Sequence, residues 1–309
     1  MATSHFIDLD GPVHYVDHGG SGRPMVLVHG LGGSYLNWML IGPLLAADHR
    51  VLAVDVAGFG LTPPAGRGTT VAANRDLLDD FCRAVAPDGP VILVGNSMGG
   101  LIVMMEAAAN PERVAATVLI DPALPMADLH TMNRFTFQRL VVPMVPGVGE
   151  AAMRLYFATT TPEEQVEETL RTITADPSVV PAEARAASVE LQRLRRGMEW
   201  SVSAFLAAAR STGIAISRRS AFRAMIHRIS APTLVIHGSQ DKIVSPGSAR
   251  WLVAQRPDWE LRIFSGLGHV PMIERPEGVA ETMRRWLATT DSSAPAAVTT
   301  MAAERLRHH

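Results

Sequence analysis

A serine flanked by glycines gives the strongest chemical signal in this 309-residue sequence. Ser97 is the central residue of a Gly-x-Ser-x-Gly motif that directly follows the apolar run 91–94. The succession of a buried strand, this motif and a helix is typical of a nucleophile elbow. Such an elbow is a sharp turn that exposes the serine hydroxyl above a sheet. Gly95 and Gly99 suit the turn, because a Cβ at either position would collide with the neighbouring strand or helix. We therefore expect Ser97 to be a nucleophile.

The base that Ser97 requires is predicted to be His269. A serine hydroxyl is a weak nucleophile until a base removes its proton, and the pKa of histidine suits this role. Eleven histidines are present, so position must distinguish them. His269 lies in a glycine-rich loop after a late apolar strand, whereas His29 and His237 directly precede glycines and are expected to anchor their own loops.

Two aspartates are candidates for the group that orients the histidine. Asp241 and Asp121 both follow apolar strands, and the chain order serine, aspartate, histidine fits either. Asp241 is preferred because it follows the strand that is nearest in sequence to the histidine loop. Asp121 is the alternative acid, although the proline after it favours a role in shaping a hinge.

The oxyanion that forms during attack on a carbonyl needs hydrogen-bond donors that are already in place. The backbone N–H groups of Met98, at the start of the helix, and of Leu31, in the glycine-rich loop 30–33, are predicted to be these donors. The spacing of that loop excludes the common phosphate-binding motifs. The residues expected to support the site are His29, Gly30, Gly95, Asn96 and Gly99.

Apolar runs alternate with helical patterns along much of the chain, and the residues 30–33, Ser97 and Asp121 each follow one of these runs. The expected strands are 25–29, 50–55, 91–94, 114–120, 232–238 and 260–264, after an opening hairpin in 5–18. Such alternation predicts an α/β fold, with a mostly parallel central sheet and helices on both faces. Ligands of such sheets bind beyond the carboxyl ends of the strands.

The alternation stops between residues 123 and 221, where helical patterns dominate. The expected helices there are 132–141, 162–175, 181–196 and 199–211. We interpret 123–221 as a helical cap inserted into a core made of residues 1–122 and 222–289, with a disordered tail at 290–309. Most methionines and phenylalanines of the cap are expected to pack against the core, and some are expected to line an apolar pocket.

Composition limits the class of protein. The formal net charge of −2 and the pI near 6.6 argue against a nucleic-acid partner. The single cysteine, Cys82, excludes an internal disulfide and a cysteine-based metal cluster, and its helical setting favours a small buried side chain. No signal peptide or membrane-spanning apolar run is recognised, so a soluble cytoplasmic protein is expected. We predict no cofactor and no metal ion, and the oligomeric state is not determined.

Together these motifs resemble those of the α/β-hydrolase superfamily over residues 5–289. The matching segments are His29-Gly30, Asp55-x-x-Gly58-x-Gly60, Gly95-Asn96-Ser97-Met98-Gly99-Gly100, Gly238-x-x-Asp241 and Gly268-His269. The resemblance implies a Ser–His–Asp triad of Ser97, His269 and Asp241. Relatives that act as haloalkane dehalogenases or epoxide hydrolases carry aspartate in place of Ser97, so those activities are disfavoured.

Our main hypothesis is a serine hydrolase, similar to esterases and lipases, whose small-molecule substrate is a carboxylic ester with an apolar acyl or alcohol part. The elbow is also similar to that of carbon–carbon hydrolases that cleave meta-ring-fission products, which is the first alternative. That group usually has tryptophan where Val270 follows His269, and its oxyanion loop differs from residues 30–33. A second alternative is a non-catalytic ligand-binding protein on the same fold.

Overall fold

The protein is described by a computed structural model, which covers residues 2–125 and 145–293. Its centre is an eight-stranded sheet with the strand order β1-β2-β4-β3-β5-β6-β7-β8. The strands are β1 (Thr3–Asp8), β2 (Pro12–Gly19), β3 (Pro24–Val28), β4 (Arg50–Val54), β5 (Val91–Asn96), β6 (Val114–Ile120), β7 (Thr233–Gly238) and β8 (Glu260–Phe264).

The pairing of these strands confirms a mostly parallel sheet. β1 pairs with β2, and β2 with β4, in antiparallel fashion, while every other neighbouring pair is parallel. The expected opening hairpin is confirmed as well. Its turn contains Asp10 and Gly11, both with positive φ.

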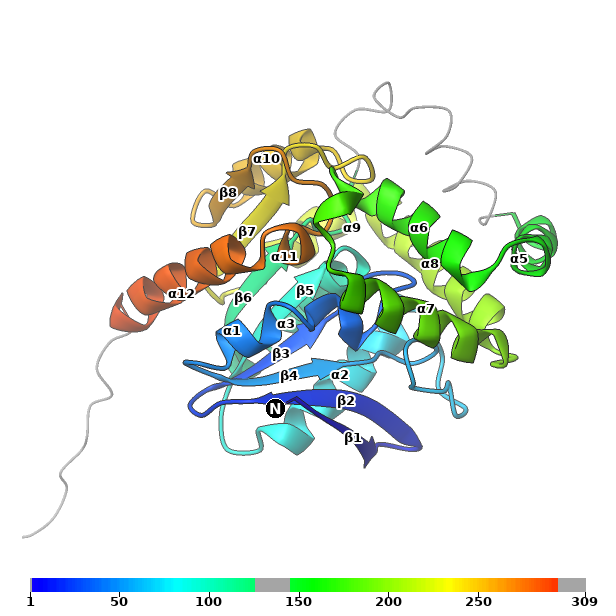
Figure 1. Ribbon diagram of the computed structural model, residues 1–309. Coiled ribbons are helices and arrows are strands. Elements are labelled where there is room, and N and C mark those ends of the chain that lie inside the picture. Colours follow the sequence, from blue (N-terminus) through cyan, green and yellow to red (C-terminus); the bar gives the residue numbers. More distant parts are fainter. Residues whose placement is uncertain (1, 126–144, 294–309) are drawn as a thin grey trace, which may run out of the picture.

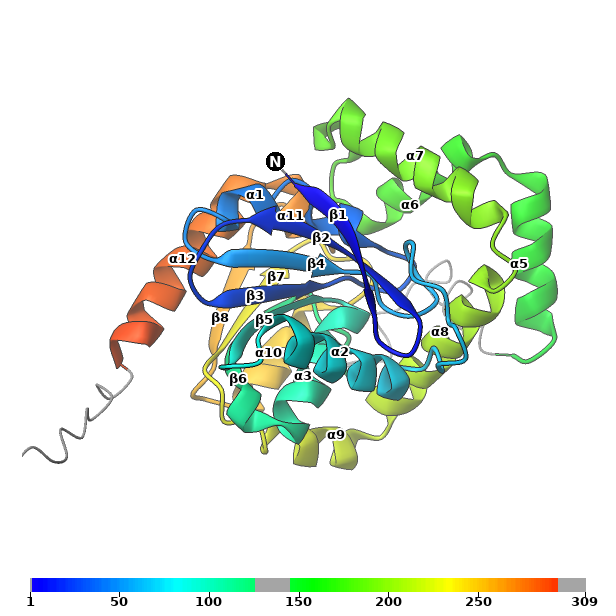
Figure 2. The same ribbon diagram turned by 90° about the horizontal axis from the view of Figure 1, so that it is seen from below.

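Both faces of the sheet are covered by helices, because its central strands are apolar on both sides. Val26 and Val28 of β3 face one hydrophobic cluster, whereas Met25 and Leu27 face the other. The first cluster includes residues of α2 (Val71–Val85), α3 (Met98–Ala109), α9 (Arg219–Ile226) and α10 (Pro246–Gln255). The second includes residues of α1 (Gly42–Leu45), α11 (Pro271–Glu274) and α12 (Pro276–Ser293). Figure 2 shows the sheet between these two layers.

Helices rather than strands occupy the described residues between β6 and β7. Besides α9, they are α5 (Val148–Thr159), α6 (Pro162–Ile173), α7 (Ala182–Arg196) and α8 (Ser201–Ser217). In Figure 1, α5 to α8 lie beyond the arrowheads of the central parallel strands. Three short 3-10 helices complete the described elements: Tyr35–Trp38, Pro111–Arg113 and Pro177–Val179.

The helical segment differs in detail from expectation. α5 and α9 were not among the predicted helices, and α8 extends to Ser217 although Gly213 lies within it. The expected helix at 132–141 lies outside the described residues. Ala123 and Leu124, at the start of the expected cap, pack in the first hydrophobic cluster, as does Ala208 of α8.

The last helix is longer than predicted. α12 continues to Ser293, so the first residues of the expected tail are helical; the next proline after Pro276 is Pro295. Residues 294–309, the remainder of that tail, lie outside the described residues. None of the helices described here has both the length and the apolar character that crossing a membrane requires.

Candidate active site

Ser97 lies in a strained turn between β5 and α3. Its backbone has φ 54° and ψ −119°, a conformation that non-glycine residues rarely adopt. The turn is held by a hydrogen bond from the Ser97 N–H to the carbonyl of Ile120, at 3.1 Å, and by one from the Ala123 N–H to the Ser97 carbonyl, at 2.9 Å. This is the geometry of the nucleophile elbow that the sequence predicted.

Close packing explains the glycines on either side of Ser97. A Cβ at Gly99 would lie 2.1 Å from the carbonyl oxygen of Val28 in β3, and one at Gly95 would lie 2.4 Å from the carbonyl oxygen of Gly99. A Cβ at Gly30 would lie 3.0 Å from the Cβ of Ser97, which places the glycine-rich loop against the serine. The backbones can approach this closely only without side chains.

His269 and Asp241 form a buried hydrogen-bonded pair. The Nδ1–H of His269 donates to Oδ2 of Asp241 at 2.7 Å, and both residues are buried. Oδ1 of the same carboxylate accepts the backbone N–H groups of Ile243 at 2.7 Å and Val244 at 3.0 Å. Asp241 therefore fixes the tautomer of His269 and leaves Nε2 available to accept a proton.

The charge balance around Asp241 favours its ionised form. Burial acts to raise the pKa of its carboxyl group, but the neighbouring His269, His237 and the N–H of Ile243 lower the pKa overall. An ionised Asp241 can stabilise the positive charge that His269 acquires when it takes a proton.

The structure also places Asn96 in contact with the histidine loop. Its Nδ2 donates to the carbonyl oxygens of Ile120, at 3.0 Å, and His269, at 3.1 Å. Because Asn96 directly precedes Ser97, one side chain ties the elbow to the backbone of the candidate base. The sequence predicted Asn96 as a supporting residue but gave no sign of this contact.

Asp121 is buried beside this pair, but its hydrogen bond goes elsewhere. Its Oδ1 accepts the N–H of Gly238 at 2.9 Å and lies 3.4 Å from Nε2 of His237. Burial and the nearby carboxylate of Asp241 raise the pKa of Asp121 well above its usual range. The geometry thus brings Asp241 rather than Asp121 into hydrogen-bonding contact with His269.

His237 anchors the loop that carries Asp241, as expected. Its Nε2 donates to the carbonyl of Val244 at 2.9 Å, and burial lowers the pKa of the imidazole. The side chains of Asp121, His237 and Asp241 each offer an atom that can bind a metal ion, and these atoms lie within 4.8 Å of one another. However, this nitrogen of His237 already donates to Val244, and both oxygens of Asp241 accept hydrogen bonds within the protein.

His29 supports the glycine-rich loop in a defined tautomer. Its Nδ1–H donates to the carbonyl of Gly30 at 2.8 Å, while its Nε2 accepts the N–H of Val56 at 3.2 Å. Burial lowers the pKa of this imidazole, which keeps it neutral. The two predicted oxyanion donors, the N–H groups of Leu31 and Met98, make no hydrogen bond to other described residues.

Two further residues beside the site carried no recognisable sequence signal. Nη1 of Arg195, on α7, donates to the carbonyl of Gly32 at 2.7 Å, across 163 residues of sequence. Glu274 accepts the N–H of Gly268, the residue before His269, at 2.7 Å. Arg195 follows other arginines on its helix, and Glu274 resembles any acidic residue of a short helix, so only the fold distinguishes them.

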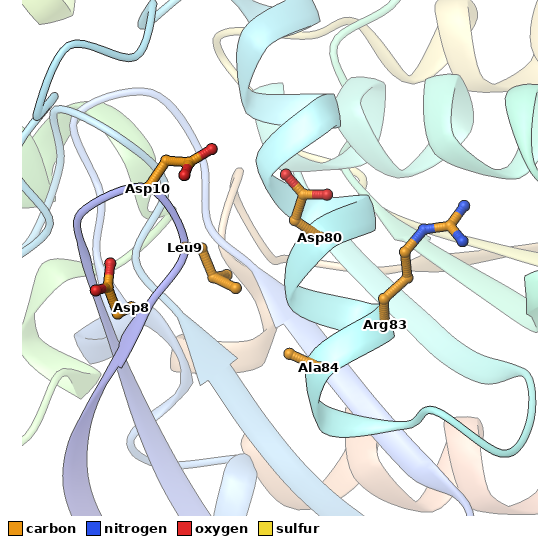
Figure 3. Close-up of a pocket in the computed structure, with 6 residues that line it drawn as sticks. All are labelled: Asp8, Leu9, Asp10, Asp80, Arg83 and Ala84. Carbon is orange, nitrogen blue, oxygen red and sulfur yellow. The ribbon is translucent and has the colours of Figure 1, made fainter.

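A separate surface hollow of about 460 Å³ lies between the opening hairpin and α2. Figure 3 shows its lining residues, which are Asp8, Leu9, Asp10, Asp80, Arg83 and Ala84. This set contains no serine, cysteine or histidine, so it lacks the nucleophile and the imidazole base of a serine or cysteine triad. The candidate active site is therefore at the elbow.

A mostly parallel sheet with a strained serine turn after a central strand defines a protein of the α/β hydrolase class. Residues 23–276 match the family model described as alpha/beta hydrolase fold, and the chain belongs to this family.

The relatives with curated names have different activities. The chain is 27% identical over 295 residues to the 2-hydroxy-6-oxo-6-(2'-aminophenyl)hexa-2,4-dienoic acid hydrolase of Metapseudomonas resinovorans, covering 93% of this chain and 91% of the relative. It is 28% identical over 261 residues to the pimeloyl-[acyl-carrier protein] methyl ester esterase of Aromatoleum aromaticum, covering 84% and 96%. A putative lipase of Acinetobacter baumannii has the same fold, with a TM-score of 0.74, 21% identity and coverage of 94% and 92%.

Proposed function

We propose that the protein is a serine hydrolase that cleaves carboxylic esters with an apolar acyl or alcohol part. The observation that carries this proposal is the combination of a strained Ser97 with a buried hydrogen bond between His269 and Asp241. Nucleophile, base and orienting acid then share one end of the sheet, as acyl transfer through a triad requires. The esterase of Aromatoleum aromaticum adds support at the level of family.

The mechanism follows from these roles. His269 takes the proton of Ser97 through Nε2 as the serine oxygen attacks the ester carbonyl, and the N–H groups of Leu31 and Met98 bind the resulting oxyanion. His269 then returns the proton to the departing alcohol, which leaves an acyl-enzyme. Water, activated by the same imidazole, releases the acid and restores Ser97.

Residues 123–221 form the substrate-selecting cap in this proposal. The position of α5 to α8 beyond the carboxyl ends of the parallel strands supports this role. Met153 and Phe157 of α5 are half-buried and are candidates for the apolar lining of the pocket. The other candidates, Met126, Met132, Phe135, Phe137 and Met144, lie outside the described residues.

Replacement of Ser97 by alanine tests the proposal. Ser97→Ala is expected to reduce kcat for a short p-nitrophenyl ester by about 10⁴-fold or more, because the nucleophile is absent. Thermal unfolding of the variant provides the control, since the substitution should leave the fold intact. Ester turnover that persists in a folded Ser97→Ala protein would reject the proposal.

A carbon–carbon hydrolase is the second candidate, and Arg195 is the observation that favours it. This guanidinium group donates to the carbonyl of Gly32 in the glycine-rich loop, and no ion pair with a carboxylate is seen for it among the described residues. An arginine in that position could bind a carboxylate on the substrate, and the relative from Metapseudomonas resinovorans is named for an acid substrate. Turnover of a vinylogous 1,5-diketone acid, without ester hydrolysis, would select this candidate.

A further inference from the structure

The end of helix α6 is joined to the backbone of the candidate base. The N–H of His269 donates to the carbonyl of Ile173, the last residue of α6, at 2.7 Å. That carbonyl is one of the four that a helix leaves without an internal partner. The helix end and the histidine therefore satisfy each other's backbone groups, and a shift of α6 would move the backbone of His269.

Glu274 reinforces this junction from the other side of the histidine. Its Oε1 accepts the N–H of Gly268 at 2.7 Å, and its Oε2 accepts the N–H groups of Ala175 at 2.8 Å and Asp176 at 3.4 Å. One carboxylate thus joins the histidine loop to the end of α6, and Ala175 precedes Glu274 by 99 residues in the sequence. Hydrogen bonds to an ionised acceptor are stronger than those to a neutral one.

The two segments are packed too closely for any side chain to separate them. A Cβ at Gly268 would lie 2.6 Å from the nitrogen of Ala175 and 2.7 Å from the carbonyl oxygen of Ile173. Figure 1 shows the end of α6 close to the short helix α11, which carries Glu274. The histidine loop therefore rests directly on the backbone of residues 173–175.

The loop that carries Asp241 is joined to the same helix end. Nζ of Lys242 donates to the carbonyl oxygens of Arg171 and Thr174, each at 3.1 Å. A cation at the carboxyl end of a helix also interacts favourably with the helix dipole. Lys242 is the single lysine of the sequence, and it directly follows the acid that orients His269.

We propose that Glu274 is a positioning residue for the catalytic histidine: its carboxylate clamps Gly268 to the end of α6 and so fixes the imidazole relative to Ser97. The proposal rests on the proposed function, because it takes His269 as the base. Lys242 has a weaker role of the same kind for the loop of Asp241. The helical segment thereby contributes to catalysis by orienting the triad, in addition to covering the substrate.

The test compares Glu274→Gln with Glu277→Gln, which alters an exposed glutamate three residues further along the chain. In Glu274→Gln an amide –NH₂ replaces one acceptor, so either Gly268 or the pair Ala175 and Asp176 loses its partner. We expect the rate of Ser97 inactivation by a fluorophosphonate, and kcat for p-nitrophenyl butyrate, to fall about tenfold while KM changes less than twofold. Glu277→Gln should match the wild type.

A second readout does not depend on activity. Amide hydrogen exchange in peptides that contain residues 173–176 and 266–270 should be at least about tenfold faster in Glu274→Gln than in Glu277→Gln. Lys242 is exposed, so Lys242→Met should not impair folding. This variant is expected to react with the fluorophosphonate about threefold more slowly than the wild type.

Each outcome decides a different claim. The proposed clamp would be overturned if Glu274→Gln left the inactivation rate, kcat and amide hydrogen exchange unchanged. A lower melting temperature with a normal kcat would overturn it as well. A wild-type protein that does not react with the fluorophosphonate would instead overturn the proposed function. Amide hydrogen exchange in Glu274→Gln and Glu277→Gln would still test whether Glu274 links Gly268 to the end of α6.

Discussion

Two buried aspartates lie close to the candidate base, and their hydrogen bonds distinguish them. Asp241 accepts Nδ1–H of His269, whereas Asp121 accepts the N–H of Gly238. The raised pKa of Asp121, caused by burial and by the charge of Asp241, favours a neutral carboxyl group there. Asp241, which is in hydrogen-bonding contact with the imidazole, is therefore the better candidate to stabilise an imidazolium ion.

Substitution of each aspartate by asparagine checks this difference. Asp241→Asn is expected to lower kcat about 10³-fold or more, because an amide cannot hold His269 in the required tautomer or balance its charge. Asp121→Asn keeps an oxygen that can accept the N–H of Gly238 and leaves the hydrogen bond between Asp241 and His269 in place, so kcat should fall less than about tenfold. Steady-state kinetics on both variants decides the matter, and a larger loss for Asp121→Asn would contradict the assignment.

A buried glutamate outside the site makes folding stability depend on pH. Glu106 of α3 accepts Nδ2–H of Asn110 at 2.9 Å, and its Oε2 has no hydrogen-bond partner among the described residues. Burial, only partly opposed by Asn110 and the nearby Arg75, raises the pKa of Glu106 from its ordinary 4.5 to about 7. The folded protein therefore holds this proton more tightly than the unfolded chain does.

Because its pKa is raised by folding, Glu106 favours the folded protein more at low pH than at high pH. The contribution of Glu106 to stability is fully present below pH 4.5 and is lost as the pH rises through about 7. Glu106→Gln should therefore be more stable than the wild type at pH 8, by about 1–2 kcal/mol, and this advantage should vanish near pH 5. Urea unfolding at both pH values measures it, and an equal difference at the two would reject the explanation.

The strand–turn–helix element around Ser97 depends on the absence of side chains at two positions. Gly99→Ala is expected to destabilise the fold by at least about 3 kcal/mol, because its Cβ would lie 2.1 Å from a carbonyl oxygen of β3. Gly89→Ala is the matched control: its Cβ would meet nothing within 4 Å, so stability should change by less than about 0.5 kcal/mol. Denaturant unfolding of both variants tests the argument, and similar stabilities would contradict it.

Elements of the core were easier to predict than those of the helical segment. A strand such as β5 is buried on both faces, so its sequence is a continuous apolar run with a clear end. The amphipathic helix α5 lacks so distinct a signal and was missed, whereas α8 continues through Gly213 because packing outweighs the low helix propensity of glycine. Local patterns therefore identified the sheet and left the surrounding helices less certain.

At the scale of the whole molecule, the site combines residues that a motif can reveal with residues that only the fold can bring together. Ser97, His269 and Asp241 each follow a strand in a recognisable context, so their types and order were sufficient to nominate them as candidates. Glu274 and Arg195 form hydrogen bonds with backbone groups of distant segments, at separations of 99 and 163 residues. Contacts of that kind depend on how the helical segment packs on the core, which periodicity does not encode.

The proposed mechanism requires a covalent acyl intermediate on Ser97. Rapid quenching of the reaction with p-nitrophenyl butyrate, followed by peptide mapping with mass spectrometry, would detect it directly. We predict a butyryl group on the peptide that contains Ser97, and on no peptide of the Ser97→Ala protein. Steady ester turnover without this adduct, or with the butyryl group on another residue, would contradict the central claim.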